Sequence, residues 1–160
     1  MNEPNNIVAD QFVIFTLDEQ SFALPLRAVV KVIQAVEVRY LPKAPEIITG
    51  IINIKGQILP VADIRKRFGL AVHEIDPDDQ IIIADTGKRK IAIAVESVNS
   101  VRNLTPDQLN AGKDKLPFAD HLSGVAKVDD GLVLIYDLNN FLSLDEQRIL
   151  DDAMNDKENE

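Results

Sequence analysis

Residues 50–64 read GIINIKGQILPVADI, and residues 124–138, GVAKVDDGLVLIYDL, follow the same pattern with no gap, so that Asp63 aligns with Asp137. In each stretch, two runs of apolar residues flank a short polar segment that contains a glycine. Apolar runs joined by such a segment are typical of β-hairpins. The chain therefore predicts two hairpins of one design, one in each half.

The likeness between the two halves extends to the segments that precede the hairpins. Residues 12–33 read FVIFTLDEQSFALPLRAVVKVI, and residues 81–102 read IIIADTGKRKIAIAVESVNSVR, with apolar residues at matching positions. A repeat period of about 70 residues is too long for a solenoid. Units of about 60 residues bury only about 60% of their unfolded surface and are marginal alone. We therefore expect two related small β units that share a core.

Short strands broken by turns dominate the predicted secondary structure. Alternating apolar and β-branched residues predict strands over these ranges: 12–17, 21–24, 32–40, 50–62 (a hairpin), 80–85, 90–96, 98–104 and 124–136 (a hairpin). Gly56 supplies the left-handed residue of the first hairpin turn. Asp63 and Asp137 are placed as N-caps of short helices. The sequence Ser-Leu-Asp-Glu at 143–146 is a capping-box pattern that opens a C-terminal helix.

These elements predict a mainly β chain built from two small barrels in tandem. The expected segments are a flexible tail at 1–11, a first barrel-like half at 12–74, a second half at 75–142, a C-terminal helix at 143–154 and a disordered acidic tail at 155–160. Exchange of strands between the two halves stays open at this point. Leu150, Ala153 and Met154 share one face of the C-terminal helix, so we expect that face to pack on the core.

The composition excludes several classes of function. The net charge is −9, and an acidic chain cannot supply the counterion release that drives binding to a phosphate backbone. There is no cysteine, so disulfides, thiolate metal sites and cysteine nucleophiles are excluded. The first residues lack the features of a signal peptide, and no apolar run approaches the ~20 residues of a membrane span. We expect a cytoplasmic protein that neither binds nucleic acid nor inserts into a membrane.

Acidic and histidine residues offer few arrangements for catalysis. Asp63 and Asp137 are equivalent and could form a symmetric acid pair, but each is placed to cap a helix. His73 is followed by acidic residues that could bind a hard cation with it, at a spacing that matches no EF-hand loop: Glu74, Asp76, Asp78 and Asp79. Residues 86–90, TGKRK, lack the P-loop pattern. We expect no enzyme, no cofactor and no metal site, with a metal-binding or enzymatic tandem barrel as the competing hypothesis.

The stretch at 50–64 resembles the signature of the CheW family of chemotaxis coupling proteins, G-x-[IV]-N-[LI]-R-G-x-[IV]-[LIV]-P-[IV]-x-[DN]-[LI]. The resemblance extends from Phe12 to about Leu142, with an opening FxxFxLxxxxFAxP and a closing GVxxxxxGLVLIxDL. It implies two five-stranded SH3-like barrels that share a middle core, with short helices and a C-terminal helix. It also implies a non-catalytic adaptor that joins the regulatory domain of a chemotaxis histidine kinase to the cytoplasmic tips of methyl-accepting chemoreceptors in a membrane-associated array.

The resemblance also implies where the partners bind. By matching position, the receptor-facing groove would be formed by Val29, Gly50, Asn53 and Lys55. The apolar surface offered to the kinase would draw on Val36, Val38 and Tyr40. Structural roles remain as alternatives, since the valines would also suit a barrel core and the glycine and asparagine would also suit a hairpin turn.

Two positions depart from the family pattern. Lys55 stands where most relatives carry Arg, and Lys31 stands where they commonly carry Glu. Lys lacks the planar fork of Arg, so the first exchange is not conservative. If the two side chains face one another, an attractive pair becomes a pair of like charges. The chain would then be a divergent paralogue that serves another chemosensory pathway, for example one that controls surface motility.

Overall fold

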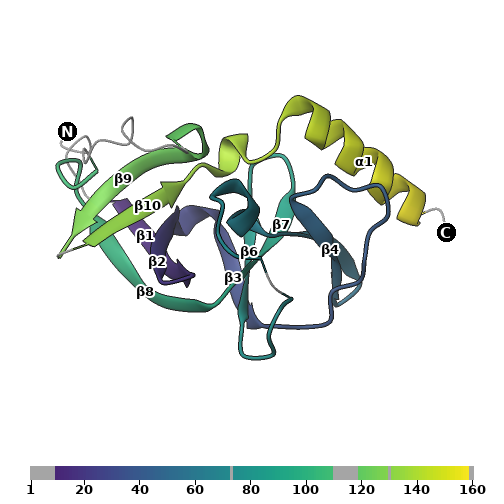
Figure 1. Ribbon diagram of the computed structural model, residues 1–160, viewed down its shortest axis with the longest axis horizontal. Helices are drawn as coiled ribbons and strands as arrows, with labels where there is room; N and C mark the ends of the chain where they lie inside the picture. Colours follow the sequence, from purple (N-terminus) through teal and green to yellow (C-terminus); the bar gives the residue numbers. More distant parts are fainter. Residues whose placement is uncertain (1–9, 73, 110–118, 130, 159–160) are drawn as a thin grey trace.

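The chain folds into two five-stranded sheets and a C-terminal helix (Figure 1). The computed structural model describes residues 10–72, 74–109, 119–129 and 131–158. The strands are β1 (Asp10–Leu17), β2 (Gln20–Pro25), β3 (Val29–Gln34), β4 (Ile48–Ile54), β5 (Gln57–Ala62), β6 (Gln80–Asp85), β7 (Lys90–Val95), β8 (Ser97–Leu104), β9 (Leu122–Val128) and β10 (Gly131–Tyr136). The helices are the short 3-10 turns η2 (Leu26–Ala28), η3 (Ile64–Arg67), η5 (Ala119–His121) and η6 (Leu138–Asn140), and α1 (Leu144–Glu158).

The two sheets have the same strand order once the repeat is taken into account. One sheet runs β8-β1-β2-β10-β9 and the other runs β3-β6-β7-β5-β4. The sequence repeat aligns β1–β2 with β6–β7, and β3–β5 with β8–β10. Each sheet therefore takes its first hairpin from the opposite half of the chain. The exchange of strands that the sequence left open does occur, and the sequence boundary near residue 74 does not divide the sheets.

The buried apolar residues form three clusters, and one of them holds the two sheets together. A middle cluster lies between the sheets and includes Phe15 and Phe22 of one sheet, Ile82 and Ile93 of the other, and Leu150 of α1. Each sheet also has its own interior cluster. Successive residues of a strand point to opposite faces, so strands such as β1 and β7 send alternate side chains into the middle cluster and an interior cluster. The predicted pair of barrels with a shared middle core is confirmed.

Two of the short helices, η3 and η6, begin after an aspartate that caps them. The Asp63 carboxylate accepts from the Arg65 N–H at 3.1 Å, and the Asp137 carboxylate accepts from the Asn139 N–H at 3.1 Å. Leu150 and Ala153 are buried, while Met154 packs against the middle cluster. The apolar face expected on the C-terminal helix is therefore the face that packs against the middle cluster.

Some element boundaries differ from those predicted. β1 begins at Asp10, inside the range expected to be a tail, and α1 continues to Glu158, inside the range expected to be disordered. The strand predicted at 32–40 ends at Gln34, because its partner β6 begins at Gln80, opposite that residue. Residues 1–9 and 159–160 lie outside the described residues. Within the described part of the chain, no helix has the length and apolar character needed to cross a membrane.

Candidate protein-binding sites at the two ends of one sheet

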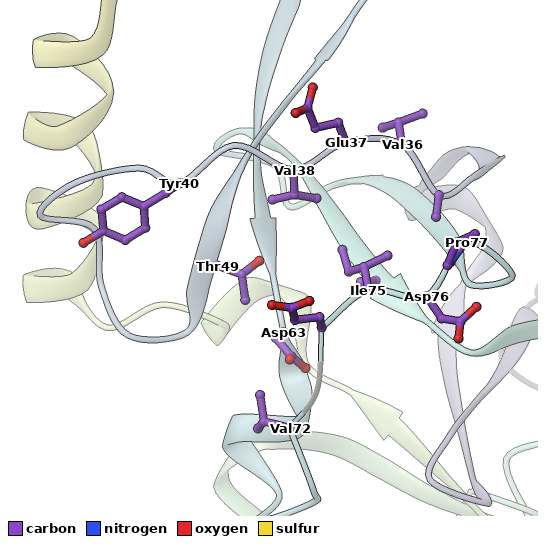
Figure 2. Close-up of a pocket in the computed structure, with 13 residues that line it drawn as sticks. Val36, Glu37, Val38, Tyr40, Thr49, Asp63, Val72, Ile75, Asp76 and Pro77 are labelled. Atoms are coloured by element: carbon purple, nitrogen blue, oxygen red, sulfur yellow. The ribbon is translucent and has the colours of Figure 1, made fainter.

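A pocket of about 870 Å³ lies at one end of the sheet β3-β6-β7-β5-β4 (Figure 2). Val36, Val38 and Tyr40 reach it from the irregular segment that follows β3, and Val72 and Ile75 reach it from the linker that precedes β6. We call it the apolar pocket. The structure thus brings together the three residues that the resemblance places on the kinase-facing surface.

Several apolar side chains of this pocket face solvent. Tyr40 is 76% exposed, Val72 is 52% exposed and Val36 is 41% exposed, so none of the three fills a barrel core. Val38 is half-buried and packs against the interior cluster of this sheet. A gathering of large exposed apolar side chains is typical of a surface that binds another protein.

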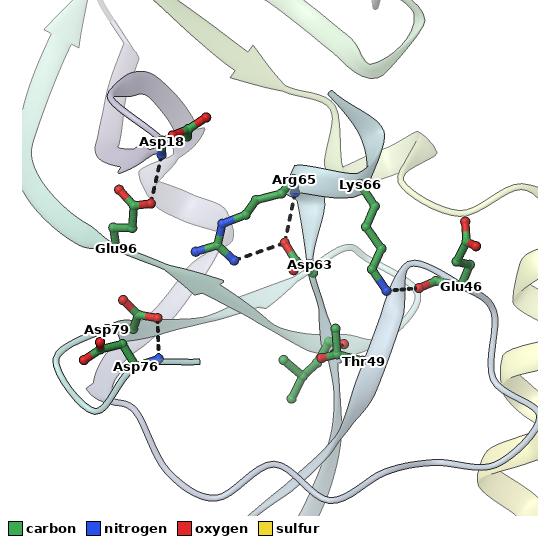
Figure 3. Close-up of polar contacts among 10 residues, drawn as sticks. Asp18, Glu46, Thr49, Asp63, Arg65, Lys66, Asp76, Asp79 and Glu96 are labelled. Atoms are coloured by element: carbon green, nitrogen blue, oxygen red, sulfur yellow. Dashed lines mark hydrogen bonds and ion pairs between the residues drawn. The ribbon is translucent and has the colours of Figure 1, made fainter. Parts of the chain in front are cut away.

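The charged residues that line the apolar pocket in the described part of the chain are all acidic: Glu37, Asp63, Glu74 and Asp76. Asp63 is buried at the end of β5, where its Oδ1 also accepts from Arg65 Nη1 at 3.3 Å (Figure 3). Arg65 is only 1% exposed, and its Nε and Nη2 have no hydrogen-bond partner among the described residues. The Asp63 carboxylate that lines the pocket is thus held by both the backbone N–H and the guanidinium of Arg65.

A second, smaller pocket of about 290 Å³ lies at the opposite end of the same sheet. It is formed at the start of β3, the turn between β4 and β5, the end of β6 and the start of β7. Its charged lining residues are Lys31, Lys55 and Lys90, and Leu59 and Ile83 lie buried at its base. We call it the lysine groove. The two lysines that depart from the family pattern therefore line one pocket, together with a third.

The turn between β4 and β5 presents Lys55 at the rim of this groove. Lys55 has φ 52° and Gly56 has φ 89°, so both turn residues are left-handed, as in a type I′ hairpin. Asn53 Oδ1 accepts from the Gly56 N–H at 2.8 Å and braces the turn. The hairpin role proposed as an alternative for Asn53 is therefore seen in the structure, and Asn53 does not line the groove.

Gly50 and Val29 hold structural positions and line neither pocket. A Cβ at position 50 would overlap the carbonyl oxygen of Arg39 and would lie 2.8 Å from Val38 Cγ1. Arg39 and Ile51 are joined there by two backbone hydrogen bonds of 2.7 and 2.9 Å, so the chain after β3 pairs with β4 at this point. Val29 packs against the middle cluster. Of the four residues predicted on the receptor side, only Lys55 lines the lysine groove.

The acidic residues considered for catalysis do not converge. Asp63 lines the apolar pocket, whereas Asp137 lines a different pocket with Pro25 and Tyr136. Asp79 accepts from the Asp76 N–H at 2.9 Å, so these carboxylates brace their own loop. His73 lies outside the described residues. Among those that are described, no group of three or more His, Asp or Glu side chains could hold a metal ion.

Sequence reasoning missed part of both sites. The sequence assigns no site role to Val72 and Ile75, which lie where the two predicted halves meet, and it predicts Lys90 only as part of the strand at 90–96. Lys90 reaches the groove because β7 lies between β6 and β5, a neighbourhood that follows from the exchange of hairpins. Only the strand order could have brought Lys90 next to Lys31 and Lys55.

Comparisons with known proteins agree with this architecture. The family model described as CheW-like domain matches residues 11–146. The chain is 25% identical over 151 residues to the chemotaxis protein CheW of Klebsiella aerogenes, covering 91% of this chain and 89% of that protein. It is 25% identical over 130 residues to protein FrzA of Myxococcus xanthus, covering 81% of each chain. The crystal structure of the scaffolding protein TtCheW from Thermoanaerobacter tengcongensis matches with a TM-score of 0.76 and 27% identity, covering 91% of this chain and 96% of that one.

Proposed function

The chain belongs to the CheW family, and from this premise we propose that it is a non-catalytic adaptor that couples a chemotaxis histidine kinase to chemoreceptor tips. It acts in the cytoplasm, held at receptor arrays through its two partners. The names of the relatives, a chemotaxis protein and a scaffolding protein, support this role. The apolar pocket and the lysine groove, two surfaces suited to protein binding, also support it.

The observation that carries the proposal is the position of the two pockets at opposite ends of one sheet. β3 runs from the lysine groove at its start to the apolar pocket beyond its end, and β5 and β7 run the same way. A six-residue strand spans about 20 Å. Two partners can therefore dock on this sheet at the same time without overlapping, which is what an adaptor must allow.

In this proposal the kinase regulatory domain docks on the apolar pocket. Tyr40 and Val36 would enter the partner's surface, since exposed aromatic and aliphatic anchors carry most of the binding energy in protein interfaces. The receptor tip docks on the hairpin that presents Lys55. Each contact can be weak, because an array adds several contacts through effective concentration.

The test measures both partners on one set of variants by isothermal titration calorimetry. Tyr40→Ala should weaken kinase binding about 30-fold, the effect of losing roughly 2 kcal/mol, while receptor binding stays unchanged. Lys55→Glu should do the reverse. Leu132→Ala and Lys127→Glu, on the other sheet, are the matched controls because both side chains are exposed and line neither pocket. If both variants weakened both partners, or if neither partner bound the unmodified protein, the adaptor proposal would be wrong.

A second candidate is an adaptor for a separate chemosensory pathway, such as one for surface motility. Lys31 favours it, because a groove lined by lysines suits receptor tips different from those that suit the Arg–Glu pair of the family pattern. The similarity to FrzA is consistent with a role beyond proteins named for chemotaxis. Binding of receptor-tip fragments from every chemosensory operon of the organism, compared in parallel, decides between the two.

A further inference from the structure

The lysine groove concentrates positive charge on an acidic protein. The net charge of the chain is −9, yet each charged residue that lines this groove is a lysine. Lys31, Lys55 and Lys90 come from three different segments, the start of β3, the β4–β5 turn and the start of β7. Three like charges around a small pocket repel one another, and this repulsion is relieved when an anionic group enters.

None of the three lysines is neutralised within the described part of the chain. Ion pairs there involve other cations, and Lys31, Lys55 and Lys90 take part in none. The nearest carboxylate in the sheet register is Asp85, directly across from Lys90. Asp85 Oδ1 instead accepts from the Gly87 N–H at 2.8 Å and braces its own turn. The positive field of the groove is therefore available to a partner.

The backbone at Lys55 places this charge at an energetic cost. A residue with a Cβ in the left-handed region costs of order 1 kcal/mol, and a glycine or asparagine at the turn would avoid most of it. The neighbouring Gly56 already meets the same demand without strain. A lysine at this turn position thus indicates a role in binding rather than in the stability of the fold.

The base and walls of the groove are apolar. Leu59 and Ile83 lie buried beneath it, and Val30 stands at its side with 49% of its surface exposed. A purely ionic ligand would leave this apolar surface in water, whereas a peptide segment with an aliphatic side chain between carboxylates would cover it. Charge and shape together describe an acidic, amphipathic occupant.

We infer that the lysine groove binds an acidic segment of the receptor tip, in which at least two carboxylates meet Lys31, Lys55 and Lys90 around an inserted aliphatic side chain. This inference rests on the proposed function and narrows it, because it states which receptor tips the chain selects. A relative with an acidic residue at position 31 would repel such a segment. The lysine at position 31 is then the residue that sets partner choice, by attraction to one class of tip and repulsion of another.

The experiment titrates receptor-tip fragments into the full chain at low and high salt. Lys31→Gln and Lys90→Gln should each weaken binding about 3- to 5-fold, the size of a surface ion pair of up to about 1 kcal/mol. Lys31→Glu should weaken it more than about tenfold, since an attraction becomes a repulsion. Lys43→Gln and Lys127→Gln, which are exposed and lie outside the groove, are the matched controls and should change nothing. Binding to the unmodified protein should fall with added salt, and this fall should shrink in the Lys31→Gln/Lys90→Gln double variant.

The possible outcomes separate this inference from the proposed function. A tip fragment that binds with the same affinity to every variant and at every salt concentration overturns the acidic-segment inference and leaves the adaptor proposal standing. If the unmodified chain binds no tip fragment, both are overturned. Inorganic phosphate or a single-stranded oligonucleotide could also bind with the same dependence on these lysines as the tip fragment. That result would overturn the inference, because the groove would then select negative charge rather than a receptor segment.

Discussion

Arg67 and Glu146 join η3 to α1 through a single carboxylate oxygen. Glu146 Oε1 accepts from Arg67 Nη2 at 2.7 Å and from the Ser143 N–H at 2.9 Å, while Ser143 Oγ accepts from the Glu146 N–H at 3.1 Å. Arg67 also donates to the carbonyl oxygen of Phe141 at 2.8 Å. The predicted capping box is therefore present, and the same carboxylate that caps α1 also anchors it to η3.

Glu146→Gln is expected to destabilise the fold. The amide oxygen can still accept from the Ser143 N–H and from Arg67, but it carries no charge to pair with the guanidinium at a site where both side chains are mostly buried. Hydrogen bonds to charged groups contribute about 1.5–3 kcal/mol, so the free energy of unfolding should fall by up to that amount. Urea unfolding followed by circular dichroism measures it, with the exposed Asp152→Asn on the same helix as the control. A variant as stable as the unmodified protein would mean that α1 is held by its apolar face alone.

The same contact predicts a dependence of stability on pH. Burial by itself raises the pKa of Glu146, but the hydrogen bond and charge of Arg67, with the two contacts to Ser143, outweigh it and hold the pKa below its ordinary value of 4.5. Because the folded pKa lies below the unfolded one, the stabilisation is complete above pH 4.5 and is lost as the pH falls through the folded value. The stability difference between the unmodified protein and Glu146→Gln, measured from pH 7 downward, should therefore shrink in that acidic range. A difference that stayed constant would show that the ionised carboxylate contributes nothing.

Gly50→Ala is expected to destabilise the fold by about 1–3 kcal/mol, the cost of inserting a methyl group into a packed region. The new Cβ would meet the backbone of Arg39, which is held by its two hydrogen bonds to Ile51 and cannot yield as a side chain could. Gly131→Ala is the matched control, because a Cβ there would have nothing within 4 Å. Thermal unfolding of the two variants compares them directly. Equal stability would mean that the backbone pairing of Arg39 with Ile51 yields to the added methyl group in solution.

The two sequence halves are expected not to fold separately. A fragment of residues 1–74 would hold β1 and β2 without β8 and β10, and it would hold β3 and β5 without β6 and β7. Neither this fragment nor one of residues 75–160 should show cooperative unfolding or dispersed amide resonances in NMR spectra. Mixing them should restore both, since every pairing partner is then present. Cooperative folding of one fragment alone would contradict the exchange of hairpins.

Local chemistry explains why much of this fold follows from the sequence. Gly56 has the left-handed backbone expected for its turn, Asp63 caps its helix, and Ser143 with Glu146 opens α1. Each of these depends on residues only a few positions apart. Runs of apolar and β-branched residues likewise located the strands, because a strand such as β7, which is buried on both faces, must be apolar along its length.

The features that could not be predicted depend on residues far apart in the chain. The two copies of the repeat are similar enough that a hairpin fits either sheet, so pattern alone cannot choose between a self-contained and an exchanged pairing. The end of β3 depends on where β6 begins, and the grouping of Lys31, Lys55 and Lys90 depends on the order of three strands. The resemblance places Gly50 at a partner contact. The pairing of Arg39 with β4 instead explains why this position holds a glycine, because no Cβ fits there.

The exchanged hairpins impose an order of events on a newly made chain. β1 and β2 leave the ribosome first, yet β8 and β10, with which they pair, lie beyond residue 96 and residue 130. At about 5–20 residues per second, the first hairpin waits several seconds with its apolar side chains uncovered. The sheet β8-β1-β2-β10-β9 can therefore be completed only after β10 has been synthesised, when a hairpin made early pairs with strands made late. A chaperone that shields Phe15 and Phe22 during that interval would raise the yield of native protein.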